Sequence, residues 1–223
     1  MTGRILIIAS YNGHRHPAIP AAQLLEYQYR QLSKLQHNLD KIVVVINGDE
    51  WRNSLLLKIE EGKLIPEPVP DFSDYQKALD LFPSRLLRPN TQGSYGAWRD
   101  GYLMYPGYEW YFFLEDDYVF NIDHFDQLMI DMWKPKATYL TELIQENHAS
   151  ISNGMTRGDV VTDWSKLPAT DIYDAHLQMN WHKCFGETGL IDIAEQYSTP
   201  FWTGREIKFQ SDKPALIVPV QML

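Results

Sequence analysis

The stretch YEWYFFLEDDYVF, residues Tyr108–Phe120, places three consecutive carboxylates at the end of an apolar, aromatic run. The large apolar residues Trp110–Leu114 have the length and composition of a buried strand, and Glu115, Asp116 and Asp117 follow at once. Buried charge is costly unless it is paired, hydrogen-bonded or bound to a cation. Either these acids mark the place where a strand reaches solvent, or they hold something positive.

Two earlier segments have the same character. Arg4–Ser10 (RILIIAS) and Lys41–Gly48 (KIVVVING) are short runs rich in β-branched residues that end in small or polar side chains, which is typical of buried parallel strands. Between them, residues 20–39 show apolar side chains near helical spacing, and Pro20 suits a first helical turn. Strand, helix and strand in this order predict a right-handed βαβ unit.

The rest of the chain predicts further elements. We expect strands at Ser84–Asn90, Lys136–Ile144 and Ala215–Leu223, helices at Gly93–Pro106, His124–Trp133, Gly158–Trp164 and Tyr173–Phe185, and a proline-rich loop at Ile65–Asp74. The predicted fold class is therefore α/β: a single Rossmann-like domain over residues 1–223, with a mostly parallel central sheet flanked by helices and an irregular α+β C-terminal third.

Composition limits the partners. The chain has 223 residues, 44% of them hydrophobic, and a net charge of -9 without a run of Lys or Arg, which argues against duplex DNA or an anionic membrane surface as a partner. A phosphorylated ligand stays possible, because a metal ion can mediate between two acidic groups. The single cysteine, Cys184, cannot form an internal disulfide, and we expect it to be a small buried side chain. No segment resembles a signal peptide or membrane span, so the expected location is cytoplasmic.

The acidic run suits a hard divalent cation such as Mn²⁺ or Mg²⁺, held by one or two carboxylates together with phosphate oxygens and water. Side chains alternate along a strand, so we expect Glu115 and Asp117 to be the metal ligands on one face, with Asp117 the principal one and Asp116 turned away. Since ligands of parallel α/β sheets bind outside the carboxyl ends of the strands, Ser10, Asn47 and the acids should converge at one edge.

Four segments together resemble a known family: IIASYN, VVVINGDE, RPNTQGSYGAWRDG and FFLEDD. They resemble nucleotide-sugar glycosyltransferases of the GT-A fold, family 2-like, over about Arg4–Ile144. The acidic run then corresponds to the D-x-D motif of that family, with Glu115 in place of the usual Asp. The segment Asn90–Trp98 is the more distinctive part of the likeness.

The resemblance implies a nucleotide-sugar-binding half at residues 1–120 and an acceptor-binding half at residues 121–223. The residues it places at the donor are Ser10, Tyr11 and Asn12 beside the base and ribose, Asn47 and Asp49 at the end of the second strand, Asn90, Gly93 and Gly96 where a helix starts close to the donor, Arg99 on the diphosphate or on a structural acid, and Asp116. Asn47 suits a plain turn equally well, and Trp98 suits the core better than a sugar platform.

An inverting transfer needs a base that deprotonates the acceptor hydroxyl. Glu187 lies about where the family has its base, and Asp159 and Asp163 are competing candidates for this catalytic role. The sequence leaves open whether the transfer is inverting or retaining. His176 and His182 lie where such enzymes sometimes have a further metal ligand, although each suits an ordinary packed histidine better.

The predicted function is metal-dependent transfer of a sugar from a nucleotide-diphosphate donor, a UDP-sugar by family resemblance, to a glycan or another hydroxyl acceptor. One alternative is a nucleotidyltransferase of related fold, which the segment SYNGHRHPAIP disfavours because it has one Gly and one Arg where a triphosphate loop needs more of both. The other is a non-catalytic module that binds a sugar or a protein partner. Neither nucleic acid nor a membrane span is expected.

Overall fold

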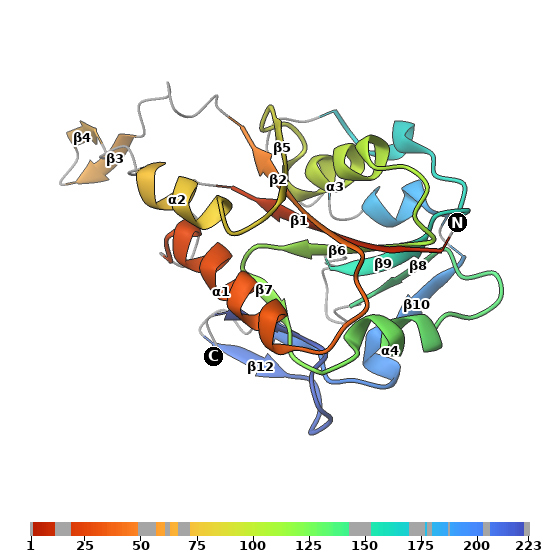
Figure 1. Cartoon of the computed structure of the whole chain (residues 1–223). Coiled ribbons are helices and arrows are strands. Elements are labelled where there is room, and N and C mark those ends of the chain that lie inside the picture. The colour runs from red at the N-terminus through yellow and green to blue at the C-terminus, as the bar shows by residue number, and fades with distance from the viewer. Residues whose placement is uncertain are drawn as a thin grey trace.

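Figure 1 shows the computed structural model of the chain, in which helices lie on both sides of a central sheet. The structure describes residues 2–11, 19–48, 57–60, 63–66, 72–142, 153–169, 177, 180–186, 188–202 and 206–220. No helix in these ranges is long and apolar enough to cross a membrane.

Most of the predicted elements of the first half are present. The helices are α1 (Ala21–Lys34), α2 (Phe72–Leu79), α3 (Gly93–Met104) and α4 (Phe125–Asp131), with short 3₁₀ turns η2 (Trp164–Lys166), η3 (His182–Cys184) and η4 (Ile193–Glu195). The strands are β1 (Arg4–Ser10), β2 (Lys41–Asn47), β3 (Leu57–Glu60), β4 (Lys63–Pro66), β5 (Ser84–Arg88), β6 (Trp110–Glu115), β7 (Tyr118–Phe120), β8 (Tyr139–Thr141), β9 (Gly154–Arg157), β10 (Leu190–Asp192), β11 (Pro200–Trp202), β12 (Ile207–Phe209) and β13 (Ile217–Pro219).

The central sheet has seven strands in the order β10-β8-β9-β6-β1-β2-β5. Neighbouring strands are parallel except at β9, which runs antiparallel to both β6 and β8. The strands β1, β2, β5, β6, β8 and β10 therefore point the same way, and their carboxyl ends meet at one edge. The predicted fold class, a mostly parallel Rossmann-like α/β sheet flanked by helices, is confirmed.

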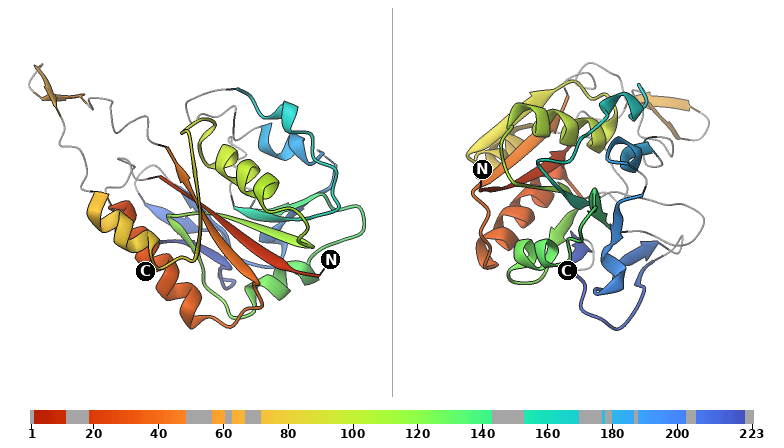
Figure 2. Two further views of the ribbon diagram at one scale, coloured as in Figure 1. Left: turned by 45° about the horizontal axis from the view of Figure 1, so that its top comes forward. Right: turned by 90° about the vertical axis from the view of Figure 1, so that its right-hand side faces the viewer.

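Alternation along β1 divides the core into two layers. Leu6 and Ile8 pack in the layer that also contains buried residues of α1, α2 and α4, whereas Ile5 and Ile7 pack in the layer of α3. The views in Figure 2 show α1 and α2 on one side of the sheet and α3 on the other. Trp98 of α3 is 0% exposed, which confirms that it belongs to the core.

Two expectations about local structure are wrong. The loop expected at Ile65–Asp74 is in part regular, because β4 extends to Pro66 and α2 begins at Phe72, where its buried face packs beside α1. The helix expected at Gly158–Trp164 does not form. Asp163 instead caps the short turn η2, whose Trp164 packs against the rings of Tyr102 and Trp181. Tertiary packing of the aromatic ring therefore overrides the local helical pattern.

The last third is irregular, as predicted, but its pieces are tied to the first half. β13, within the expected strand Ala215–Leu223, pairs antiparallel with β7 directly after the acidic turn. β9 inserts between β6 and β8, and Gly154 permits this, because a Cβ there would lie 2.3 Å from the Leu140 carbonyl oxygen. Of the helix expected at Tyr173–Phe185, the structure describes η3 and a few residues before it. Cys184 is buried, as expected.

Candidate functional site

The carboxylates of the acidic run point to opposite sides of the sheet. Glu115 Oε1 accepts a hydrogen bond from the Ser94 hydroxyl in the first turn of α3, and the Glu115 backbone N–H donates to Asn153 Oδ1 at 2.8 Å. Asp116 lies on the other side, where its Oδ2 accepts from Ser10 Oγ at 2.7 Å and from the Tyr11 backbone N–H at 3.1 Å. The acids are therefore built into the ends of two neighbouring strands and do not simply extend into solvent.

Ser10 links the ends of β1 and β6 to α2. Its hydroxyl has a single proton, which it gives to Asp116, so the 2.8 Å contact with Tyr75 Oη has tyrosine as the donor. Both Ser10 and Asp116 are 0% exposed. The expected convergence of Ser10, Asn47 and the acidic run at one edge is confirmed, since Ala9 pairs with Glu115 and Ser10 pairs with Ile46 next to Asn47.

Asp117 lies beyond the strand. β6 ends at Glu115, and Asp116 and Asp117 form the tight turn to β7. Strand alternation therefore does not extend to Asp117, contrary to the expectation that Glu115 and Asp117 share a strand face. Asp117 is half-buried, and its carbonyl oxygen accepts from the Val220 backbone N–H at 2.8 Å. The chain after β13 thus holds the acidic turn in place.

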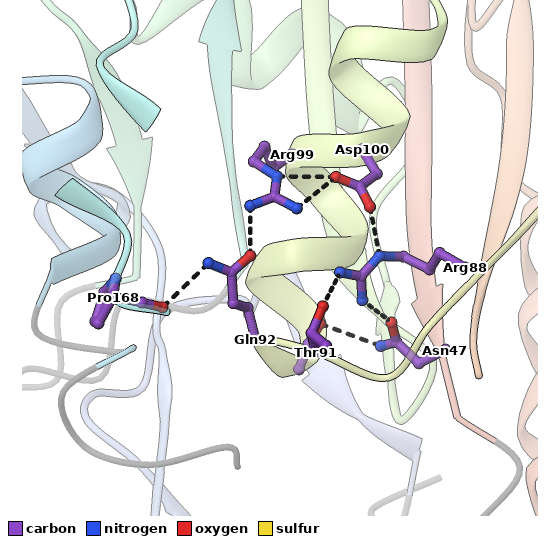
Figure 3. Close-up of polar contacts among 8 residues, drawn as sticks. Asn47, Arg88, Thr91, Gln92, Arg99, Asp100 and Pro168 are labelled. Atoms are coloured by element: carbon purple, nitrogen blue, oxygen red, sulfur yellow. Dashed lines mark hydrogen bonds and ion pairs between the residues drawn. The ribbon is translucent and has the colours of Figure 1, made fainter. Parts of the chain in front are cut away.

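A second group of polar side chains surrounds the start of α3 (Figure 3). Arg88 at the end of β5 is 5% exposed, and its guanidinium donates to Asn47 Oδ1 at 2.5 Å, to Asp100 Oδ2 at 2.6 Å and to Thr91 Oγ1 at 3.0 Å. Burial lowers the pKa of Arg88, and the hydrogen bond to Asp100 opposes that effect. Asn47 Nδ2 in turn donates to the Gly93 carbonyl at 3.2 Å. We call these side chains, with Gln92 and Arg99, the α3 network.

Arg99 belongs to the same network and pairs with a structural acid. Its Nε donates to Asp100 Oδ1 at 2.8 Å, and its Nη1 donates to Gln92 Oε1, while Gln92 Nε2 donates to the Pro168 carbonyl at 3.1 Å. The contact with a structural acid, one of the two roles that the sequence left open for Arg99, is present.

The close packing and the backbone conformation of the Asn90–Trp98 segment explain its glycines. A Cβ on Gly96 would lie 2.5 Å from the Thr91 carbonyl oxygen and 2.6 Å from Arg88 Nη2, so only glycine leaves room for the guanidinium. Gly93 has a φ of +53°, in the left-handed region that favours glycine. Asn90 is half-buried and packs against Gly48, whose own Cβ would lie 2.6 Å from the Asn90 nitrogen.

The acidic turn offers an incomplete set of metal ligands. In the part of the chain that the structure describes, no three His, Cys, Asp or Glu side chains lie together as a metal cluster. Glu115 and Asp117 supply carboxylate oxygens, which are the hard ligands that Mn²⁺ and Mg²⁺ prefer. Such ions commonly bind through one or two carboxylates and complete their shell with substrate phosphate and water, so these residues fit an ion that binds together with a phosphorylated ligand.

Two of the candidate catalytic acids, Asp159 and Asp163, lie apart from this turn. Asp159 follows β9, whose Arg157 pairs with Trp110 at the start of β6, so it lies toward the opposite edge of the sheet, in an exposed ion pair with Arg157. Asp163 is exposed and accepts from Ser165 Oγ at 2.6 Å, and this hydrogen bond lowers the pKa of Asp163. His182 is half-buried in η3. The remaining candidates, Asn12, Asp49, His176 and Glu187, lie outside the described residues.

One acid at the carboxyl edge of the sheet, Glu142, was not among the candidates from the sequence. Glu142 directly follows β8, is 3% exposed, and has a buried Oε1 without a hydrogen-bond partner among the described residues. Burial, and then the nearby Asp192, raise the pKa of Glu142 well above its ordinary value. The sequence did contain a signal, because YLTE at residues 139–142 repeats the pattern of FFLE at residues 112–115, an apolar strand that ends in glutamate.

Similarity to known proteins is found at the level of structure and is distant. No protein-family model matches the chain, and no curated protein matches it. Among solved structures, the crystal structure of S. aureus TarS is similar at a TM-score of 0.43 and 11% sequence identity, over 86% of this chain and 35% of that one. This chain therefore spans about a third of the length of that structure, and the function must be argued from the residues of the chain itself.

Proposed function

We propose that this protein transfers a sugar from a nucleotide-diphosphate donor to a hydroxyl group of a glycan or another acceptor, with Mn²⁺ or Mg²⁺ bound at the acidic turn. The uridine diphosphate donor comes from the family resemblance alone. The observation that carries the proposal is the meeting of Ser10, Asn47 and the acidic run at the carboxyl edge of a mostly parallel sheet, where ligands of such folds bind.

Different residues of the chain contact different parts of the donor in this proposal. In this proposal Ser10 and Tyr11 at the end of β1 border the base and ribose, and Asn12 and Asp49, which follow β1 and β2 in the sequence, belong to the same donor site. The α3 network holds Asn47 and the start of α3 in position beneath them. Glu115 and Asp117 are the proposed ligands of the ion. When bound, that ion supplies positive charge against the charge that grows on the departing diphosphate.

The acidic balance of the chain supports a role for a metal. With a net charge of -9, and with Arg88 and Arg99 held by Asp100, the α3 network has little positive charge to offer a diphosphate. A divalent cation between the carboxylates and the phosphates resolves the repulsion between them. We therefore expect donor affinity to depend on the metal.

A thermal-shift panel tests the proposal. The protein is heated with UDP-, GDP-, CMP- and dTDP-sugars, each with Mn²⁺ and with EDTA, and every donor that stabilises the fold is then tested for release of its nucleotide. We expect stabilisation by a UDP-sugar in Mn²⁺ only, followed by slow hydrolysis, since water can replace the acceptor. Equal stabilisation in EDTA would contradict metal-dependent donor binding. Binding without hydrolysis or transfer would favour the non-catalytic module, and release of pyrophosphate from a nucleoside triphosphate would favour the nucleotidyltransferase.

A further inference from the structure

Glu142 occupies a position equivalent to that of the acidic run, two strands away. Thr141 of β8 and Phe113 of β6 both pair with Gly154 of the intervening β9. Glu142, one residue beyond Thr141, is therefore level in register with Leu114 and one residue short of Glu115. At the usual spacing of strands, the backbones of β6 and β8 lie about 10 Å apart. Both glutamates therefore follow the carboxyl ends of strands at the same edge of the sheet.

Asn153 connects the two positions. Its Oδ1 accepts from the Glu115 backbone N–H at 2.8 Å, and its carbonyl oxygen accepts from Thr141 Oγ1 at 3.0 Å. Both Asn153 and Thr141 are 0% exposed. The ends of β6 and β8 are thus fixed relative to one another by buried hydrogen bonds, which is the rigid support that a pair of reacting groups needs.

Among the described residues, the carboxyl of Glu142 has no ion-pair partner, whereas that of Asp126 has one through Oδ2 although its Oδ1 lacks a hydrogen-bond partner. Asp126, 0% exposed, forms an ion pair with Arg4 at 2.5 Å and accepts from the Asn38 backbone N–H at 2.8 Å. Glu142 Oε1 has no such partner among the described residues, and its charged neighbour Asp192 has the same sign. Burying a carboxyl without such a partner costs free energy. Strongly perturbed acids of this kind concentrate at functional sites.

We infer that Glu142 contacts the acceptor hydroxyl and takes its proton during sugar transfer. This inference rests on the proposed function. In the step, the acceptor oxygen bonds to the anomeric carbon, the bond from that carbon to the diphosphate oxygen breaks, and the diphosphate leaves with the electron pair. The acceptor proton passes to a carboxylate oxygen of Glu142. The reaction is then a single displacement, which inverts the configuration at the anomeric carbon.

The environment of Glu142 suits a base better than those of the other described candidates. Its raised pKa gives its carboxylate a higher proton affinity than an exposed acid has, and catalysis improves as the pKa of a base approaches the working pH. Asp159 is held in an exposed ion pair by Arg157. Hydrogen bonds from Ser165 lower the pKa of Asp163, which weakens Asp163 as a base. Glu142 also lies at the same edge of the sheet as the proposed metal ligands.

The test compares Glu142→Gln with wild-type protein in two measurements, donor affinity and donor hydrolysis in Mn²⁺, using the UDP-sugar that the thermal-shift panel selects. We expect unchanged donor affinity, within about twofold, and at least about a hundredfold slower hydrolysis, which is the usual share of a general base. Asp126→Asn is the matched control, because it alters a buried acid remote from the site and should leave hydrolysis by the folded protein unchanged.

Each possible result of these measurements supports or contradicts the role of Glu142 as the base. Hydrolysis by Glu142→Gln within about threefold of wild type would overturn the inference, as would a large loss in Glu187→Gln with none in Glu142→Gln. If Glu142→Gln does not fold, Glu142→Met keeps the length of the side chain without an amide to bury. Loss of donor affinity in both variants would make Glu142 a structural residue. A wild-type protein that neither binds nor hydrolyses any donor of the panel would instead end the proposed function, and the inference with it.

Discussion

Charged side chains have different surroundings on the two sides of β6 in the sheet. On the side of β2, β5 and α3, Arg88 and Arg99 share Asp100, and the neutral side chains around them exchange hydrogen bonds. On the side of β8 and β10, Glu142 is buried beside Asp192, and its Oε1 has no hydrogen-bond partner among the described residues. The first arrangement stabilises the edge of the sheet at which we propose that the donor binds. The second places two acids side by side, and this is where we propose that the acceptor binds.

The largest effect on stability is expected from the α3 network. Arg88→Met keeps the stem but leaves Asn47 and Asp100 without their donor. Removing one partner of a buried charge pair costs about 3–5 kcal/mol, and we expect about 3 here because Asp100 is 28% exposed and keeps Arg99. For a chain of this size the melting temperature should fall by roughly 6–12 °C.

Arg85→Met is the matched control for that variant. Arg85 lies on the same strand, but it forms an exposed ion pair with Asp80, which contributes little. Its melting temperature should stay close to that of wild type, as measured by circular dichroism. Equal melting temperatures for the Arg88 and Arg85 variants would mean that the α3 network does not stabilise the fold.

Asp117→Asn tests the acidic turn. The change keeps the size of the side chain and removes its charge, so a metal role predicts a folded protein that has lost Mn²⁺-dependent donor binding. Hydrolysis should slow by about a hundredfold or more, which corresponds to about 2.7 kcal/mol of transition-state stabilisation. Calorimetry with and without Mn²⁺ measures the binding. Undiminished metal dependence in this variant would remove Asp117 from the site.

Asp116→Asn separates structure from metal binding at the same turn. Because Asp116 accepts from Ser10 and from the Tyr11 N–H, its replacement should act mainly on stability. We expect a lower melting temperature with donor affinity still dependent on Mn²⁺. A complete loss of metal dependence with an unchanged melting temperature would assign Asp116, rather than Asp117, to the ion.

Gly96→Ala should have an intermediate effect. The added methyl would lie 2.5 Å from the Thr91 carbonyl oxygen and 2.6 Å from Arg88 Nη2, so the guanidinium must move. Overpacking of this kind costs about 1–3 kcal/mol. Urea denaturation of Gly96→Ala in wild-type and Arg88→Met backgrounds checks the cause, since the cost should shrink once the guanidinium is gone. Equal costs in both backgrounds would point to the Thr91 carbonyl alone.

The smallest expected effect is a change in how stability depends on pH. The raised pKa of Glu142 means that, above the ordinary value of 4.5, the folded protein still holds a proton that the unfolded chain has lost. This contribution to stability is complete below 4.5 and disappears as the pH rises through the folded pKa. Glu142→Gln should therefore lose less stability than wild type as the pH rises above 4.5. Parallel curves of unfolding free energy against pH would contradict the raised pKa.

The sequence predicted β1, β2 and β6 well because the interior of each strand is a short, apolar run. Arg4–Ser10, Lys41–Asn47 and Trp110–Glu115 are buried on both faces, which leaves a strong pattern and makes their polar ends conspicuous. Prediction was weaker where contacts between distant segments decide the structure. α2 follows a proline-rich stretch, and η2 replaces an expected helix because Trp164 joins a distant aromatic cluster.

The sequence by itself determined that three strands end in polar residues and that an acidic run closes the third, because hydrophobic runs and turn residues are local signals. The tertiary structure decided which of these polar groups have hydrogen-bond or ion-pair partners and which are buried. Arg99 is held by Asp100 and Gln92, and Glu142 becomes a buried acid only through the pairing of β8 with β9 and of β9 with β6. Burial and hydrogen-bond partners depend on neighbours distant in sequence, and these two quantities set the charge and the proton affinity of a side chain.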